Sequence, residues 1–131
     1  MLAEHLSDLK ALQTTPFDEY TNNKILRGYT ERTLQVCVQI CLDIGHHLIA
    51  ECNFRAPEDN KDVFVVLTEA HVIPETLCPN LLNMAGFRNI IVHDYARVAN
   101  DVVYGILTHD LGDFAAFAKA IIDFIDPVPE T

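Results

Sequence analysis

The stretch of residues 101–125, DVVYGILTHDLGDFAAFAKAIIDFI, carries the clearest fold signal in the chain. Its apolar residues recur at steps of four, four, three, four, three and four positions. This spacing is typical of one face of an amphipathic α-helix. The line consists of Val103, Leu107, Leu111, Phe114, Ala118, Ile121 and Ile125. We therefore expect a long final helix whose apolar line packs against other helices.

The same helical spacing recurs upstream. Residues 2–13 repeat leucine at three- and four-residue steps, and Pro16 ends this first helix. Residues 22–52 predict a long second helix. Residues 53–60 carry the turn residues of a loop, and residues 62–71 predict a third helix.

The region before the last helix contains two prolines and a glycine that can begin, interrupt or bend a helix. Pro74 suits the first turn of a fourth helix, whereas Pro79 predicts a kink or a restart. Gly86 allows a second bend. Residues 97–100 indicate a turn in which Asn100 is a candidate N-cap.

The predicted fold class is therefore all-α, an antiparallel bundle of about five helices. Residues 1–131 are expected to form a single domain, because half of the residues are hydrophobic and the length suits one core. Phe17 and Tyr20 are expected to pack the first connection against the bundle. Residues 126–131, which contain two prolines, are expected to form a loose tail.

The charge balance limits the classes of function. Nine basic and 19 acidic residues give a net charge of −10, whereas nucleic-acid affinity usually comes from lysine and arginine. The arginines are scattered along the chain. This argues against a protein that coats nucleic acid, but it leaves room for a small basic cleft or for a basic protein partner.

Neither a membrane span nor a secretory signal is predicted. There is no uninterrupted apolar run of about 18 residues. The N-terminus has no basic flank followed by an apolar run. We expect a cytoplasmic protein.

The four cysteines, Cys37, Cys41, Cys52 and Cys78, do not predict a metal site or a disulfide framework. No Cys-x-x-Cys pair occurs, and buried thiols in helix cores are common. We therefore expect neither a metal nor a cofactor.

Asp43 lies among apolar residues of the long predicted helix. It is either an exposed acid or a buried acid that is paired with an arginine. The exposed alternative is favoured, because burying an unpaired carboxylate is costly.

The densest polar chemistry lies between Arg88 and Tyr95. Arg88 offers a permanent charge and a fork of donors that suits phosphate, and His93 titrates near neutral pH. Asn89 both donates and accepts hydrogen bonds, and Tyr95 supplies a hydroxyl. Together these groups could cleave a phosphodiester. Histidine would transfer protons, arginine would stabilise the charge of the transition state, and no metal would be needed.

On an ideal helix, the side chains of Arg88, Asn89, His93 and Tyr95 form one broad polar side and not a tight cluster. At about 100° per residue, all four lie within an arc of about 160°. Asn89 and His93 share one face, and Arg88 and Tyr95 share another line. An arginine and a histidine at this spacing are most often structural, so the spacing alone leaves the function open.

The run Arg88-Asn89…His93-Asp94-Tyr95 resembles the signature of the HEPN superfamily, and most closely that of the HepT toxins. Further resemblance lies in Met84-Ala85-Gly86-Phe87, Leu34-Gln35, Asp43-Ile44-Gly45 and Phe17-Asp18-Glu19-Tyr20. It covers about residues 4–125.

The resemblance implies a HEPN-like bundle that forms a homodimer, with two copies of the motif lining one ribonuclease cleft. Arg88 and His93 would be catalytic, with Asn89 beside them. Tyr95 would be adenylylated by a cognate minimal nucleotidyltransferase (MNT) antitoxin, which would silence the toxin. The implied function is that of a toxin in a type VII-like HEPN/MNT pair, a metal-independent endoribonuclease that cleaves RNA such as tRNA or mRNA.

Two alternatives remain open. The polar face could belong to a non-catalytic module that binds a nucleotide or docks a nucleotidyltransferase, and the negative charge favours this alternative. A helical oligomerisation protein without a ligand would explain the amphipathic helices, but it would leave the polar run without a purpose.

Overall fold

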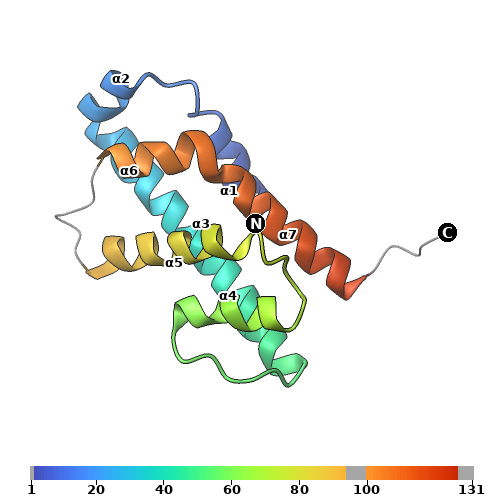
Figure 1. Ribbon diagram of the computed structural model, residues 1–131. Coiled ribbons are helices and arrows are strands. Elements are labelled where there is room, and N and C mark those ends of the chain that lie inside the picture. Colours follow the sequence, from blue (N-terminus) through green and yellow to red (C-terminus); the bar gives the residue numbers. More distant parts are fainter. Residues whose placement is uncertain (1, 94–99, 127–131) are drawn as a thin grey trace.

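The computed structural model describes the backbone of residues 2–93 and 100–126, and the side chains of residues 2–88 and 102–126 (Figure 1). All regular structure in these residues is helical. The elements are α1 (Leu2–Lys10), α2 (Phe17–Asn22), α3 (Lys24–Glu51), α4 (Asn60–Glu69), α5 (Cys78–His93), α6 (Asn100–Gly105), the π-helical segment η2 (Ile106–Asp110) and α7 (Leu111–Ile125).

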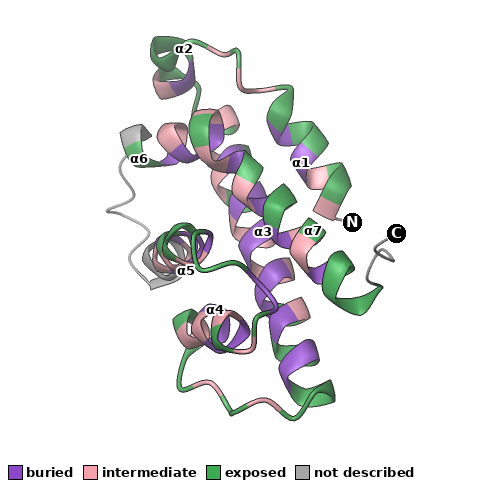
Figure 2. Cartoon of the chain, turned by 45° about the vertical axis from the view of Figure 1, so that its right-hand side comes forward, coloured by how far each residue is buried: buried purple, intermediate pink, exposed green. Residues whose placement is uncertain are grey.

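The longest helix, α3, is the centre of the bundle. It begins at Asn23, whose side-chain oxygen accepts a hydrogen bond from the Leu26 N–H at 3.0 Å and caps the helix. It packs against α1, α2, α4, α5, α6 and α7. Buried residues consequently run along its length (Figure 2).

By length and composition alone, α3 is also apolar enough to cross a membrane. Half of the most apolar 18-residue stretch of α3 is buried inside the bundle, and the core helix of a soluble protein has the same length and composition. The expectation of no membrane span is compatible with this burial.

Aromatic contacts at the two ends of the bundle define the directions of the helices. The rings of Tyr20 and Tyr104 lie 5.4 Å apart at one end, and those of Phe54 and Phe124 lie 6.5 Å apart at the other. α3 and the α6–α7 rod therefore run in the same direction. α1 runs antiparallel to both, and Figure 1 shows α5 crossing α3.

The predicted all-α bundle is confirmed. Its expected five helices correspond to α1, α3, α4, α5 and the rod made of α6, η2 and α7. Most of the predicted apolar line of that rod is buried, but Ile125 is 66% exposed. The two successive four-residue steps of the line coincide with η2, whose i→i+5 turn is wider than an α-helical turn.

The first connection contains the short helix α2, which was not predicted. Tyr20 is fully buried, as expected, and its burial raises the pKa of its hydroxyl to about 12. The expectation for Phe17 was wrong in part. Its side chain is 41% exposed, although its ring packs edge-on against Tyr104.

Pro74 does not begin the fourth helix, so the kink or restart expected near Pro79 has no preceding helix to interrupt. Pro74 precedes a turn in which its carbonyl accepts a hydrogen bond from the Leu77 N–H at 3.0 Å. α5 begins at Cys78, so that Pro79 lies in its first turn, where a missing N–H costs little. α5 continues through Gly86 without a break, so the bend that this glycine allows does not interrupt the helix.

Asn100 is the first residue of α6, and residues 97–99 of the predicted turn lie outside the described residues. Of the predicted tail, only Asp126 is described. Its N–H donates to the Ile122 carbonyl at 2.8 Å and closes α7.

The substitution Gly45→Ala should destabilise the protein by about 1–3 kcal/mol through overpacking between α3 and α4. A Cβ at Gly45 would lie 2.5 Å from Val63 Cγ1 and 3.3 Å from Leu67 Cδ1. Gly28 in the same helix provides the control, because a Cβ there meets nothing within 4 Å. Gly28→Ala should stabilise by about 0.5–1 kcal/mol, since alanine loses less entropy in a helix. Urea denaturation measures both, and equal effects would refute the close approach.

The substitution Gly86→Ala tests whether α5 needs flexibility at that position. An added Cβ would meet only the flexible end of the Lys61 side chain, at 3.4 Å. The variant should therefore gain about 0.5–1 kcal/mol of stability, as alanine does within a regular helix. A loss of stability by thermal unfolding would indicate that the bend exists in solution.

Candidate active site

The predicted site residues lie toward the end of α5. Arg88, Asn89 and His93 are all within this helix, so the helical spacing assumed from the sequence holds for them. The side-chain positions of Asn89 and His93, and the whole of Tyr95, lie outside the described residues. Arg88 is thus the site residue whose contacts the structure defines.

The side chain of Arg88 is half-buried and crosses from α5 to α3. Its Nη2 donates a hydrogen bond of 2.7 Å to Oε1 of Gln39. The amide of Gln39 in turn donates from Nε2 to Oδ1 of Asp43, at 2.8 Å. A continuous chain of hydrogen bonds therefore connects the guanidinium to an exposed carboxylate one turn further along α3.

This chain resolves the two alternatives for Asp43. The residue is exposed, as favoured, and within the described part of the chain it connects to an arginine through the amide of Gln39. Gln39 was not singled out from the sequence. Its four-residue spacing to Asp43 could have suggested the shared helix face, but the partner is 49 residues away along the chain.

The remaining donors of Arg88 define what it can bind. Its Nε is buried and has no hydrogen-bond partner among the described residues. A guanidinium carries five N–H donors and no acceptor, so most of its donors are not used by Gln39. Such a group suits the oxygens of a phosphate.

Arg55 shows a different use of an arginine in the same chain. Its guanidinium donates to Asp62 at 2.7 Å and to Glu69 at 2.9 Å, which ties the loop before α4 to that helix. The hydrogen bond from Arg55 lowers the pKa of the Asp62 carboxyl to about 2. Arg55 is thus paired with carboxylates, whereas among the described residues Arg88 bonds to a neutral amide.

A shallow groove follows the same face of α3. It has a volume of about 240 Å³, and it is lined by Arg32, Gln35, Val36, Gln39, Ile40 and Asp43. Arg32 is exposed and donates a long hydrogen bond of 3.4 Å to Gln35. The groove thus places the exposed cation of Arg32 on the face of α3 to which Arg88 bonds.

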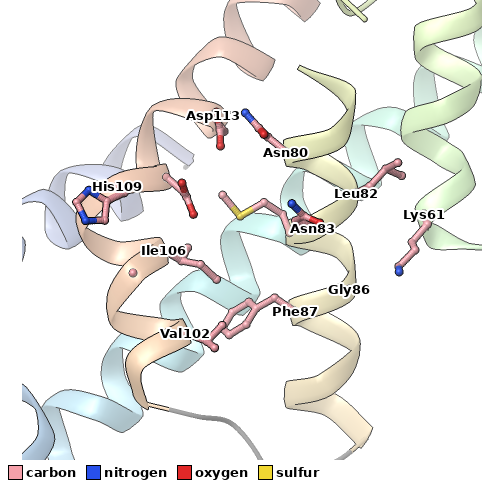
Figure 3. A pocket seen from close by; sticks show the side chains of 13 residues that line it. Lys61, Asn80, Leu82, Asn83, Gly86, Phe87, Val102, Ile106, His109 and Asp113 are labelled. Carbon is pink, nitrogen blue, oxygen red and sulfur yellow. Dashed lines mark hydrogen bonds between the residues drawn. The ribbon is translucent and has the colours of Figure 1, made fainter. Parts of the chain in front are cut away.

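A larger cavity of about 600 Å³ lies on another side of α5, between this helix and the α6–η2 segment (Figure 3). Figure 3 shows the Phe87 side chain opposite Val102. At the rim, the Asn80 amide donates to Asp113 at 3.2 Å, and burial raises the pKa of that carboxyl. The sequence patterns did not predict this cavity, because it arises where two helices distant in sequence diverge.

The cysteines do not form a metal centre within residues 2–88 and 102–126. Burial raises the pKa of the Cys37 thiol to about 11 and that of Cys41 to about 12, so both are neutral thiols at physiological pH. No group of three or more histidine, cysteine or acidic side chains in those ranges is placed to hold a metal ion.

Comparison with known proteins agrees with the resemblance seen in the motif. The family model described as ribonuclease HepT-like matches residues 2–121. The chain is 36% identical to the mRNA nuclease HepT of Shewanella oneidensis over 88 residues, which cover 67% of this chain and 66% of that protein. That match thus spans just under two thirds of the relative. The tRNA nuclease HepT of Aphanizomenon flos-aquae is 22% identical over 130 residues, which cover 99% of this chain and 88% of that protein.

Solved structures show the same fold. The tri-AMPylated HEPN toxin of Shewanella oneidensis in complex with its MNT antitoxin matches with a TM-score of 0.83 and 28% identity, over 92% of this chain and 90% of that one. A toxin–antitoxin structure with AMP-PNP matches with a TM-score of 0.85 and 27% identity, over the same shares of the two chains.

The family model covers nearly the whole helical bundle, including the helix that carries Arg88 and His93. The chain therefore belongs to the HepT-like ribonuclease family.

Proposed function

We propose that this protein is the toxin of an HEPN/MNT toxin–antitoxin pair and that it cleaves RNA without a metal ion. The observation that carries the proposal is Arg88, a cation held across α5 and α3 in a helix that also contains His93. The family match and the similar mRNA and tRNA nucleases support RNA as the substrate.

In the proposed reaction, a histidine removes the proton of the RNA 2′-hydroxyl, and the resulting oxygen attacks the adjacent phosphorus. The bond to the 5′-oxygen then breaks, and that oxygen takes up a proton from an acid. His93 fits either proton-transfer role, because its pKa lies near neutral pH in the unperturbed state. Arg88 would stabilise the additional negative charge on the phosphate oxygens. Asn89 would supply a further hydrogen bond.

A homodimer would supply both proton-transfer groups. Each chain contributes one His93, whereas the reaction needs a base on one side of the phosphorus and an acid on the other. Two copies of the α5 motif around one cleft would satisfy both needs. RNA and the ATP needed for adenylylation both occur in the cytoplasm, which we propose as the place of action.

Adenylylation of Tyr95 by an MNT antitoxin would silence this site. The solved complex of an AMPylated HEPN toxin with an MNT antitoxin supports the proposal. An AMP group two residues after His93 would bring a negative phosphate to the charge of Arg88 and would occupy the space that RNA needs.

A non-catalytic docking module for a nucleotidyltransferase is the second candidate, and the net charge of −10 favours it. The two candidates differ in one respect: only the toxin cleaves RNA and arrests growth when it is expressed alone.

The variants Arg88→Ala and His93→Ala should each lose RNA cleavage by a factor of about 100 or more, since proton transfer and charge stabilisation each contribute on this scale. The assay uses purified protein and RNA in the presence of EDTA. His46→Ala, which alters an exposed histidine of α3, is the matched control and should cleave at the parental rate. Parental rates for both site variants would disprove the assignment, and an inactive parent would favour the docking module.

Incubation with the cognate nucleotidyltransferase and ATP should add AMP to the protein, as measured by intact mass. Tyr95→Phe should abolish this addition, whereas Tyr29→Phe, which alters an exposed tyrosine of α3, should not. The modified protein should lose RNA cleavage, because the added phosphate opposes substrate binding. Unchanged mass in the parent would contradict the proposed silencing.

A further inference from the structure

We infer that Gln39 is a positioning residue for Arg88, and that Asp43 fixes the orientation of the Gln39 amide. The inference rests on the proposed function of Arg88. It is carried by two hydrogen bonds in series, 2.7 Å from Arg88 to Gln39 and 2.8 Å from Gln39 to Asp43.

The chemistry of the three groups allows only one arrangement. A guanidinium can only donate hydrogen bonds, and an ionised carboxylate can only accept them. The amide of Gln39 stands between them and must turn its oxygen toward Arg88 and its nitrogen toward Asp43. Asp43 thereby selects one of the two orientations of the amide, and that orientation presents an acceptor to Arg88.

The surroundings of Arg88 make this acceptor important. Its side chain is half-buried, and its Nε is buried without a partner among the described residues. Among the described residues, the bond to Gln39 is the contact that orients the guanidinium relative to α3. A fixed plane matters because a bidentate contact with a phosphate requires defined directions of the N–H donors.

A neutral partner also preserves the charge of Arg88. Arg55 donates to two carboxylates, which compensate its charge. The hydrogen-bond partner of Arg88 on α3 is instead the neutral amide of Gln39, and the carboxylate of Asp43 accepts from that amide. The guanidinium is therefore oriented while its positive charge remains for an anionic substrate.

The first test compares Gln39→Met with Gln35→Met. Methionine preserves length and apolar packing, but it accepts only weakly and cannot bridge a donor and an acceptor. Gln35 lies one turn earlier on α3 and bonds to Arg32 instead, so it is the matched control. Gln39→Met should lower kcat for RNA cleavage about tenfold, the scale of one hydrogen bond to a charged group, and should change KM less than about twofold. Gln35→Met should retain the parental kcat, and equal kcat values for all three proteins would overturn the inference.

The second test asks whether Gln39 acts through Arg88. In an Arg88→Ala background, Gln39→Met should cause no further loss of cleavage, because the group that it positions is already absent. A further tenfold loss in that background would show a merely structural role and would overturn the inference.

Asp43 provides the conservative comparison. Asp43→Asn retains an oxygen that can accept from the Gln39 amide, so cleavage should stay near the parental rate. Asp43→Ala frees the amide to rotate, and its kcat should fall toward that of Gln39→Met. Identical behaviour of the asparagine and alanine variants would contradict the proposed role of Asp43.

A measurement without RNA separates this inference from the proposed function. The Nε–Hε resonance of Arg88 is assigned in ¹⁵N NMR spectra by its absence in Arg88→Ala. It should move toward the position of a free arginine in Gln39→Met but not in Gln35→Met. If Arg88→Ala still cleaves RNA, the proposed function fails while the spectra still decide whether Gln39 holds the guanidinium. If the resonance is unmoved in Gln39→Met, the positioning role fails on its own.

Discussion

The bundle depends on the burial of α3, because all six of the other α-helices that the structure describes pack against it. At Gly45, α4 lies too near α3 for a side chain to be added without a shift. α4 packs against both α3 and α5, and close-packed interiors transmit small displacements. A displacement of α4 would therefore also move α5 relative to α3, and with it the contact between Arg88 and Gln39.

The sequence predicted most of the architecture and the location of the candidate site. Periodicity is a property of single helices, and it identified α1, α3, α4 and the final rod within a few residues of their ends. It did not indicate α2, whose six residues FDEYTN are too few to show a helical repeat. It also did not indicate that α3 and α7 run in the same direction, because an apolar face says that a helix is buried but not against which neighbour.

The same limit applies to the site. Arg88 was found because polar groups are dense around it within one stretch of chain. Gln39 was not singled out, because its contact with Arg88 joins two helices and the two residues are 49 positions apart. In the acidic chain, Arg88 would supply the local cation for the anionic substrate that we propose. The net charge of −10 belongs to the whole surface, whereas the guanidinium of Arg88 keeps a local positive charge.

The π-helical segment η2 gives the final rod one place where its length can change. A π turn contains about one more residue than an α turn, so a one-residue deletion between Ile106 and Asp110 would convert η2 to ordinary helix while the helix faces on either side stay nearly aligned. A one-residue deletion within α7 would in contrast rotate the part before it by about 100° and turn Val103 away from the core. Insertions and deletions should instead accumulate in the surface connections at residues 11–15 and 53–59, where added length carries a small entropic cost.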